Sequence, residues 1–210
     1  MTNKSSIKVS NMQANPFLVT KEDIVKRKRK EIIFSGMGGQ GLVTAGSILA
    51  RAMILFDRKN ATQSQNYGPE SRGGLSISEV IISDDEIDYP KVIADPQILV
   101  TLSEESFDHY KDTMKGASHL IVDPEIIKNI DDYIPNLPGV DVHKIPITRE
   151  AEILGNKIVG NIIVLGVIVS ILDLNIEAVK KAVELQFSSK QKLIPLNIKA
   201  LERGIELGKN

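Results

Sequence analysis

The segment Gly36–Gly41, with the sequence GMGGQG, most constrains how this chain can fold. It follows a short apolar run, Ile32–Phe34, and precedes a run with helical periodicity, Leu42–Leu55. Glycines at such a turn let the backbone approach a ligand closely, and the start of the helix offers free N–H groups and a partial positive charge. The pattern predicts a ligand-accessible turn between a first strand and a first helix.

A second segment, Tyr67–Gly74, has the sequence YGPESRGG and combines a phenol, an anion and a permanent cation. The planar fork of Arg72 suits a carboxylate or a phosphate, and Glu70 could orient it. Loops that follow the strands of an open α/β sheet emerge at the carboxyl edge, so Gln40, Tyr67, Glu70 and Arg72 are expected to share one rim. The alternative is that Glu70 and Arg72 pair with each other, or with a neighbouring subunit, and touch no ligand.

The rest of the chain alternates between strand and helix patterns. Strands are expected at 31–35, 60–64, 75–83, 98–102, 119–122 and 140–145, and helices at 42–56, 149–154, 158–172, 176–187 and 195–207. Ser103 is expected to cap a helix that ends near 115, and Asp123-Pro124 to open a short one. This alternation predicts an α/β fold, a three-layer Rossmann-like sandwich with a mostly parallel sheet, right-handed crossovers and a helical C-terminal part. We expect a single α/β domain over 30–210, preceded by a flexible basic tail over 1–29.

Bulk properties exclude several functional classes. A net charge of −1 and an aromatic content of 4% argue against nucleic-acid binding, so the basic cluster Lys26–Lys30 is interpreted as a solvated or partner-contacting lead-in. The chain has no cysteine, which excludes disulfides, thiolate catalysis and a cysteine-ligated iron–sulfur cluster within it. Its histidines, His109, His119 and His143, lack metal-ligand spacing, so no metal site is expected. The longest apolar run, 158–172, is shorter than the about 20 residues that span a bilayer, and no secretory signal is visible. A cytoplasmic protein without membrane contact is predicted.

Gly36, Gly38 and Gly41 satisfy the spacing of the dinucleotide-binding fingerprint. A nicotinamide enzyme should also carry an acidic residue at the end of its second strand. Asp57 has roughly the right spacing, but it precedes the expected second strand, so the fingerprint is incomplete. An autonomous dinucleotide-binding Rossmann dehydrogenase therefore stays as an alternative. Gln40 is unusual in a phosphate loop, and its amide could either donate to a ligand or hold the neighbouring loop.

Together the two glycine segments resemble the gamma subunit of 2-oxoacid:ferredoxin oxidoreductases, in the pyruvate/ketoisovalerate oxidoreductase gamma-domain family. The similarity covers roughly 30–208 and continues through 44–46, 63–66, 78–83, 87–90 and 95–96, and through Asn161 with Leu165-Gly166. The RGG ending of the second segment is most like the 2-oxoglutarate type, since pyruvate-type relatives carry Arg-x-Gly-Ala there. The tail before residue 30 departs from the family pattern.

The resemblance implies oxidative decarboxylation, in which a 2-oxoacid, coenzyme A and oxidised ferredoxin give an acyl-CoA, CO2 and reduced ferredoxin. It implies thiamine diphosphate, Mg2+ and iron–sulfur clusters in partner alpha and beta subunits, with a possible delta or ferredoxin-like subunit. This chain has no cysteine and no thiamine signature, so it is expected to bind none of these cofactors alone and to be inactive alone. No catalytic residue or metal ligand is assigned. The candidates for the substrate or coenzyme A side are Gly36, Gly38, Gly39, Gln40, Gly41, Tyr67, Glu70 and Arg72. A purely structural assembly subunit, whose loops bind only protein, is the remaining alternative.

Overall fold

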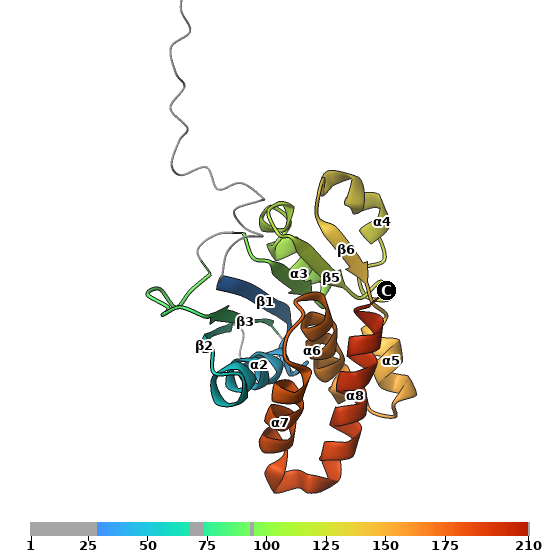
Figure 1. Ribbon diagram of the computed structural model, residues 1–210. Coiled ribbons are helices and arrows are strands. Elements are labelled where there is room, and N and C mark those ends of the chain that lie inside the picture. Colours follow the sequence, from blue (N-terminus) through green and yellow to red (C-terminus); the bar gives the residue numbers. More distant parts are fainter. Residues whose placement is uncertain (1–28, 68–73, 93–94, 210) are drawn as a thin grey trace, which may run out of the picture.

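The computed structural model describes residues 29–67, 74–92 and 95–209, which build a six-stranded sheet between two layers of helices (Figure 1). The strand order is β2-β3-β1-β4-β5-β6. The pairs β1–β4, β4–β5 and β5–β6 are parallel, whereas β3 runs antiparallel to both β1 and β2. The strands are β1 (Arg29–Met37), β2 (Asn60–Tyr67), β3 (Leu75–Ser83), β4 (Ile98–Thr101), β5 (His119–Val122) and β6 (Asp141–Lys144). The sheet is therefore mostly parallel, with one reversed strand.

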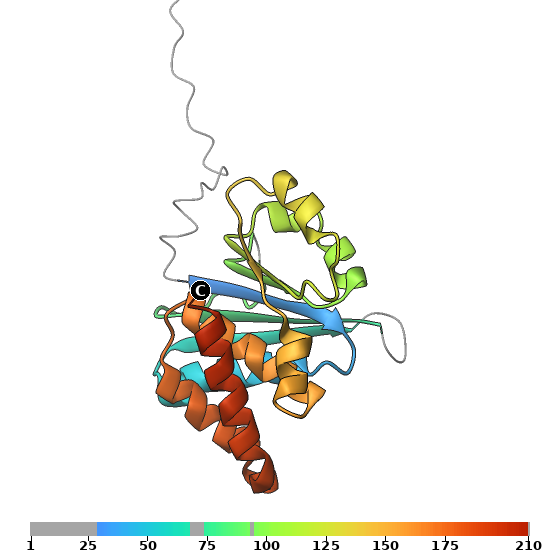
Figure 2. The ribbon, with the colours of Figure 1, turned by 90° about the vertical axis from the view of Figure 1, so that its right-hand side faces the viewer.

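Helices cover both faces of the sheet (Figure 2). One face carries α2 (Leu42–Phe56), α5 (Ile147–Ile153), α6 (Gly160–Ile171), α7 (Ile176–Gln186) and α8 (Ile194–Leu207), and the other carries α3 (Glu104–His109) and α4 (Ile130–Tyr133). Short 3-10 turns lie at η1 (Thr113–Lys115), η2 (Ile134–Asn136), η3 (Lys157–Val159) and η4 (Ser188–Leu193). This arrangement confirms the predicted three-layer α/β sandwich with a helical C-terminal part. Of the predicted tail, 1–28 lie outside the described residues.

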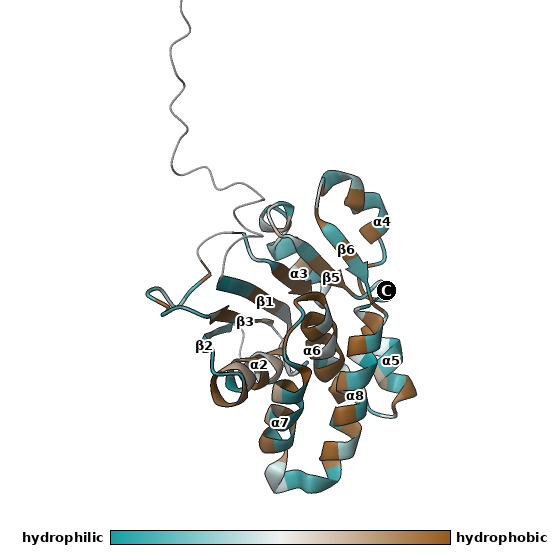
Figure 3. Ribbon diagram, viewed as in Figure 1, coloured by the Kyte–Doolittle hydropathy of each residue, from teal (hydrophilic) through white to brown (hydrophobic). Residues whose placement is uncertain are grey.

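Helix α6 forms the centre of the larger core. It is hydrophobic along most of its length, as Figure 3 shows, and it is buried from Gly160 to Val169. Its backbone lies close against α8: a Cβ atom added at Gly166 would lie only 2.3 Å from the carbonyl oxygen of Leu201. A Cβ atom at Gly204 would lie 2.0 Å from the carbonyl oxygen of Ile163. Close packing at these two glycines fixes the position of α6 relative to α8.

Most predicted elements have the observed bounds within a few residues, and 42–56 and 75–83 agree at both ends. The second strand is longer than predicted, because β2 pairs with β3 in one register from Asn60 to Tyr67 and so satisfies its backbone groups. The helix capped by Ser103 ends at His109, and the chain continues in turns to η1, so the predicted end near 115 was wrong. Asp123-Pro124 opens a turn and no helix: the N–H groups of Ile126 and Ile127 both donate to the carbonyl oxygen of Asp123, and the next helix, α4, begins only at Ile130.

Candidate functional site

The turn after β1 depends on two glycines with left-handed backbone. Gly39 has φ 95° and Gly41, which precedes α2, has φ 76°. Side chains rarely adopt such conformations, so glycine is required at both positions. The N–H of Gly38 donates to the carbonyl oxygen of Gly74 at 2.8 Å. This bond joins the first glycine loop to the residue that directly precedes β3.

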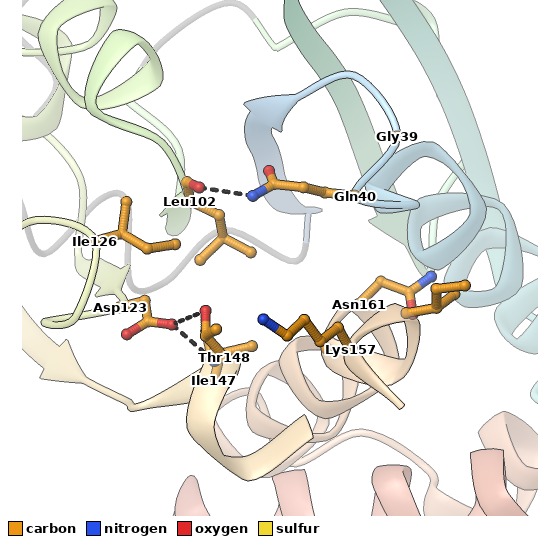
Figure 4. Close-up of a pocket in the computed structure, with 11 residues that line it drawn as sticks. Gly39, Gln40, Leu102, Asp123, Ile126, Ile147, Thr148, Lys157 and Asn161 are labelled. Atoms are coloured by element: carbon orange, nitrogen blue, oxygen red, sulfur yellow. Dashed lines mark hydrogen bonds between the residues drawn. The ribbon is translucent and has the colours of Figure 1, made fainter. Parts of the chain in front are cut away.

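Gln40 connects the loop after β1 to the loop after β4. Its Oε1 accepts from the N–H of Met37 at 2.7 Å, and its Nε2 donates to the carbonyl oxygen of Leu102 at 2.9 Å (Figure 4). A Cβ atom at Gly36 would lie 2.2 Å from Oε1, so Gly36 leaves room for the amide. Of the two roles considered for Gln40, the structure shows that it holds the neighbouring loop.

The loops after β1 and β4 lead to helices on opposite faces, α2 and α3. Such a point of divergence at the carboxyl edge is where ligands bind in open α/β sheets. A cavity of about 280 Å³ lies there. Its lining comes from the ends of β1, β4 and β5 and from α5, η3 and α6: Gly39, Gln40, Leu102, Asp123, Ile126, Ile147, Thr148, Lys157, Ile158, Gly160 and Asn161 (Figure 4).

Asp123 clamps the end of β5 to the start of α5. Its Oδ2 accepts from the N–H of Thr148 at 2.8 Å and from the Thr148 hydroxyl at 2.7 Å, while Oδ1 accepts from the N–H of Glu125. The residue is fully buried, and both carboxylate oxygens have partners. Both carboxylate oxygens of Asp123 already accept hydrogen bonds within the chain, so we assign this residue a structural role in the wall of the cavity.

Of the described residues that line this cavity, one carries a cationic side chain, and it lies on the opposite wall. Lys157 is exposed, points into the space between Thr148 and Asn161 in Figure 4, and forms an ion pair of 2.7 Å with Glu152. The hydrogen bond to Glu152 raises the pKa of Lys157 above its ordinary value, so its amine is charged at neutral pH. Gly160 and Asn161, the first residues of α6, lie beside it, and a helix N-terminus favours negative charge.

Several residues of the family resemblance pack α2 onto the sheet and do not line the cavity. The Nε2 of Gln63 donates to the carbonyl oxygen of Val43 and to the hydroxyl of Ser78, both at 2.8 Å. A Cβ atom at Gly46 would lie 2.4 Å from that hydroxyl. The small residue and the amide–hydroxyl pair thus let α2 approach β2 and β3 closely.

The candidate residues have different positions in the structure. Gly39 and Gln40 line the cavity, and Gly36, Gly38 and Gly41 shape the loop beneath it. The backbone of Tyr67 lies at the same edge, since Tyr67 and Gly36 both pair with Ser76, from opposite sides of β3. Glu70 and Arg72 lie outside the described residues.

Sequence reasoning did not assign four polar side chains of the cavity to the site: Asp123, Thr148, Lys157 and Asn161. Asn161 was noted only as part of the family resemblance. Asp123 could have been predicted from the sequence, because it directly follows a buried strand, and the carboxyl ends of parallel strands lie at the same edge of the sheet. Asp57, the residue considered for a dinucleotide ribose, lies at the far end of α2 and accepts from the side-chain amide of Asn175 at 2.7 Å.

Comparison with known proteins identifies the family of this chain. The family profile described as pyruvate ferredoxin/flavodoxin oxidoreductase matches residues 31–207. The chain belongs to this oxidoreductase family. Within it, the "2-oxoglutarate synthase subunit KorC" of Methanocaldococcus jannaschii is 43% identical, over 87% of this chain and 96% of that protein. The resemblance read from the two glycine segments is confirmed.

Solved structures support the fold. The gamma subunit of a keto/oxoacid ferredoxin oxidoreductase from Geobacter sulfurreducens is 37% identical, with a TM-score of 0.69 over 86% of this chain and 97% of that chain. A 2-oxoglutarate:ferredoxin oxidoreductase from Magnetococcus marinus, with 2-oxoglutarate, coenzyme A and succinyl-CoA bound, has a TM-score of 0.78 at 20% identity. The match covers 88% of this chain and 32% of the Magnetococcus marinus chain, and it shows that the two share the fold. Among the described residues, no helix of this oxidoreductase-family chain is long and apolar enough to cross a membrane.

Proposed function

We propose that this chain is the gamma subunit of a 2-oxoglutarate:ferredoxin oxidoreductase. The complex would convert 2-oxoglutarate, coenzyme A and oxidised ferredoxin into succinyl-CoA, CO2 and reduced ferredoxin. The observation that carries the proposal is the 43% identity to KorC across nearly the whole of both chains. The RGG ending of the second glycine segment, which resembles the 2-oxoglutarate type, supports the same substrate.

The cavity at the carboxyl edge is the proposed contribution of this chain to the active complex. Lys157, which is exposed and paired with Glu152, and the N-terminus of α6 supply positive charge, and Gly39 lets the backbone approach a ligand. These features suit the carboxylate of a 2-oxoacid or a phosphate of coenzyme A. A cavity of about 280 Å³ holds a group of 2-oxoacid size but only part of coenzyme A. Partner subunits would therefore complete the site.

Partner subunits would also supply the redox chemistry. With no cysteine, this chain cannot ligate an iron–sulfur cluster through thiolates. Thiamine diphosphate, Mg2+ and the clusters are accordingly assigned to alpha, beta and possibly delta or ferredoxin-like subunits, in a cytoplasmic complex. Residues 30–210 would form the gamma domain, in agreement with the match over 31–207. The side chains of Ile153 and Ile158, 69% and 72% exposed beside the cavity, are available for contact with such a partner.

Two alternatives have less support. An autonomous dehydrogenase would need an acidic residue at the end of its second strand to hold the ribose, whereas β2 ends at Tyr67, and Asp57 lies at the far end of α2 and accepts from Asn175. A purely structural subunit is the second candidate, because the side chains of Gln40 and Asp123 both form hydrogen bonds within the chain. Variants of the two glycine loops distinguish it from a ligand-binding subunit. If such variants assemble normally and retain full activity, the subunit is purely structural.

The test is purification of the native complex, identification of its chains by mass, and a panel of 2-oxoacids with a viologen dye. We expect alpha and beta partners, coenzyme A-dependent dye reduction and a preference for 2-oxoglutarate. The chain expressed alone should be colourless and inactive. Turnover by the isolated chain, or a native complex that rejects 2-oxoglutarate while accepting another 2-oxoacid, would contradict this assignment.

A further inference from the structure

Strand β2 lies at one end of the strand order, with β3 as its neighbour. In Figure 1 it lies at the margin of the sheet, next to α2. Among the described residues, no strand pairs with its outer side. The outer edge of such a strand presents the backbone N–H and C=O groups of every second residue, and these groups can pair with another strand.

The edge of β2 lacks the features that usually prevent strand addition. Its eight residues, NATQSQNY, include no charged residue and no proline. Each residue from Asn60 to Tyr67 pairs with one residue of β3, so no bulge twists the edge away. Natural proteins protect exposed edges with charges, prolines, bulges or very short strands. In a chain with 25% charged residues, a long regular edge without any charge favours coverage by another strand.

The chemistry of this edge suits a second copy of the same strand. A two-fold axis brings each residue close to residues of the same strand in the other copy, so a charged edge would repel itself. Amide and hydroxyl side chains are both donors and acceptors, and they can therefore pair with their own kind. Six of the eight residues of β2 are Asn, Gln, Ser or Thr. Two of them, Gln65 and Asn66, are exposed and lie on opposite faces of the strand.

We propose that two copies of this chain join through their β2 edges, in antiparallel orientation, to form one continuous sheet. The two-fold axis of an antiparallel strand pair stands perpendicular to the sheet. Each face of the joined sheet therefore carries the same helices from both copies, with α2 and its counterpart on either side of the new strand pair. Because α2 packs against both β2 and β3, it supports the edge strand from one face.

This pairing leaves the cavity of each copy open. Strand β2 runs parallel to β1, because both are antiparallel to β3. The carboxyl ends of β1 and β2 therefore lie at the edge that holds the cavity. In an antiparallel pair the two carboxyl edges point to opposite ends of the joined strands, so each cavity can still be completed by other subunits. The inference depends on β2 and not on the proposed 2-oxoglutarate chemistry.

The test is sedimentation velocity of the untagged full chain over a range of concentrations, for the wild type and for Gln65→Lys and Asn66→Lys. We expect a reversible dimer of the wild type. Each lysine places a charge at the edge shared with the other copy, so the dissociation constant of the dimer should rise about fivefold or more, which corresponds to about 1 kcal/mol. Gln191→Lys in η4 and Asn136→Lys in η2 are matched controls at exposed positions, and both should dimerise as the wild type does.

Hydrogen exchange of the wild type locates the contact without any substitution. The amides of 60–67 should become more protected as the concentration rises and the dimer forms. A chain that stays monomeric at every concentration, a dimer with the same dissociation constant in both edge variants, or a dimer without added protection of 60–67 would overturn the proposal. Protection of 60–67 in the native complex but not in the isolated wild-type chain would assign the edge to a strand of another subunit, and it would overturn the proposal as well.

Discussion

The side chain of Asn161 donates a hydrogen bond of 3.0 Å to the carbonyl oxygen of Gly41, across 120 positions of sequence. The bond ties the first turn of α6 to the glycine turn before α2. A Cβ atom at Gly41 would lie 2.6 Å from the Asn161 amide nitrogen, so glycine is needed there for space as well as for its backbone conformation. Two walls of the cavity are thus positioned by one side-chain amide.

Replacement of Asn161 by Asp tests this link. The carboxylate keeps the shape of the amide but cannot donate to the Gly41 carbonyl oxygen. We expect the free energy of unfolding to fall by about 1–3 kcal/mol, measured by urea denaturation. In the assembled complex, turnover should fall as well, because the glycine turn loses its anchor. Asn136→Asp, at an exposed position in η2, is the control and should change neither quantity.

Replacement of Gln40 by Glu tests the bridge between the two loops. The new side chain still accepts from Met37 but places a carboxylate oxygen against the Leu102 carbonyl oxygen, where the wild type has a donor. A loss of about 1–3 kcal/mol is expected in thermal or urea unfolding. Gln191→Glu, exposed in η4, provides the comparison. Wild-type stability in Gln40→Glu would show that the bridge contributes nothing to holding the loops.

Gly204→Ala should be strongly destabilising. The added methyl carbon would lie 2.0 Å from the carbonyl oxygen of Ile163, and backbone atoms cannot rotate away as a side chain can. Overpacking of this kind costs about 1–3 kcal/mol, which corresponds to a fall in melting temperature of about 2–4 °C for each kcal/mol. Lys199→Ala, on an exposed position of the same helix, should melt close to the wild type. An unchanged melting temperature for Gly204→Ala would mean that α8 shifts freely over α6.

The ion pair between Glu150 and Arg203 predicts a pH dependence. Glu150 accepts two hydrogen bonds from Arg203, at 2.7 and 2.9 Å, and this lowers the pKa of the carboxyl group. A lowered pKa in the folded state means that the pair stabilises the protein above the ordinary carboxyl range. This stabilisation is lost as the pH falls below about 4.3. Glu150→Gln should therefore cost about 1 kcal/mol at pH 7, and this cost should become smaller as the pH falls below the ordinary carboxyl range.

Unfolding curves of wild type and Glu150→Gln at pH 7 and at pH 3 decide this prediction. Glu184→Gln is the control, because Glu184 is an exposed residue of α7. A difference between wild type and Glu150→Gln that stays the same at pH 3 would point to lost packing between α5 and α8, and not to the charge.

Most of the fold could be predicted from the sequence, because helices and strands are marked by local patterns of hydrophobic residues and turn residues. The helix 42–56 and the strand 75–83 are marked by their own periodicity and by neighbouring Gly and Asp residues, so their bounds agree at both ends. Long-range contacts left no such mark. Asn161 and Gly41 meet only because α6 returns to the carboxyl edge, and His119 meets His143 only through the register of β5 and β6. Spacing along the chain therefore gave no sign of the histidine pair.

The cavity was predicted in part for the same reason. Gly39 and Gln40 belong to a motif whose residues are contiguous, so the carboxyl edge was identified correctly as their location. Thr148 and Lys157 reach the cavity from elements that follow the last strand, and their side chains have no motif of their own. Arg72 remains a prediction, because it lies outside the described residues.

Arg72 is predicted to meet an anionic group, either the carboxylate of the 2-oxoacid or a phosphate of coenzyme A. A permanent cation with two parallel donors suits that role, and lysine is only a partial substitute. Loss of one charge-assisted hydrogen bond, at about 1.5–3 kcal/mol, corresponds to a roughly 10- to 150-fold fall in kcat/KM. Arg72→Ala should show this fall for one of the two anionic substrates in a complex that still assembles, and Arg72→Lys should recover part of it.

Size-exclusion chromatography alongside steady-state kinetics separates this role from pairing with Glu70 or with a partner subunit. If Arg72 serves only assembly, Arg72→Ala should yield less complex, and the complex that forms should have wild-type kcat/KM for both substrates. If Arg72 binds a substrate anion, the yield should hold and one kcat/KM should fall. The hydrogen bond from Gly38 to Gly74 makes the second outcome the expected one, because it joins the second segment at its last residue to the turn that carries Gly39 and Gln40. Wild-type kinetics for both substrates in a fully assembled Arg72→Ala complex would exclude a ligand-binding role.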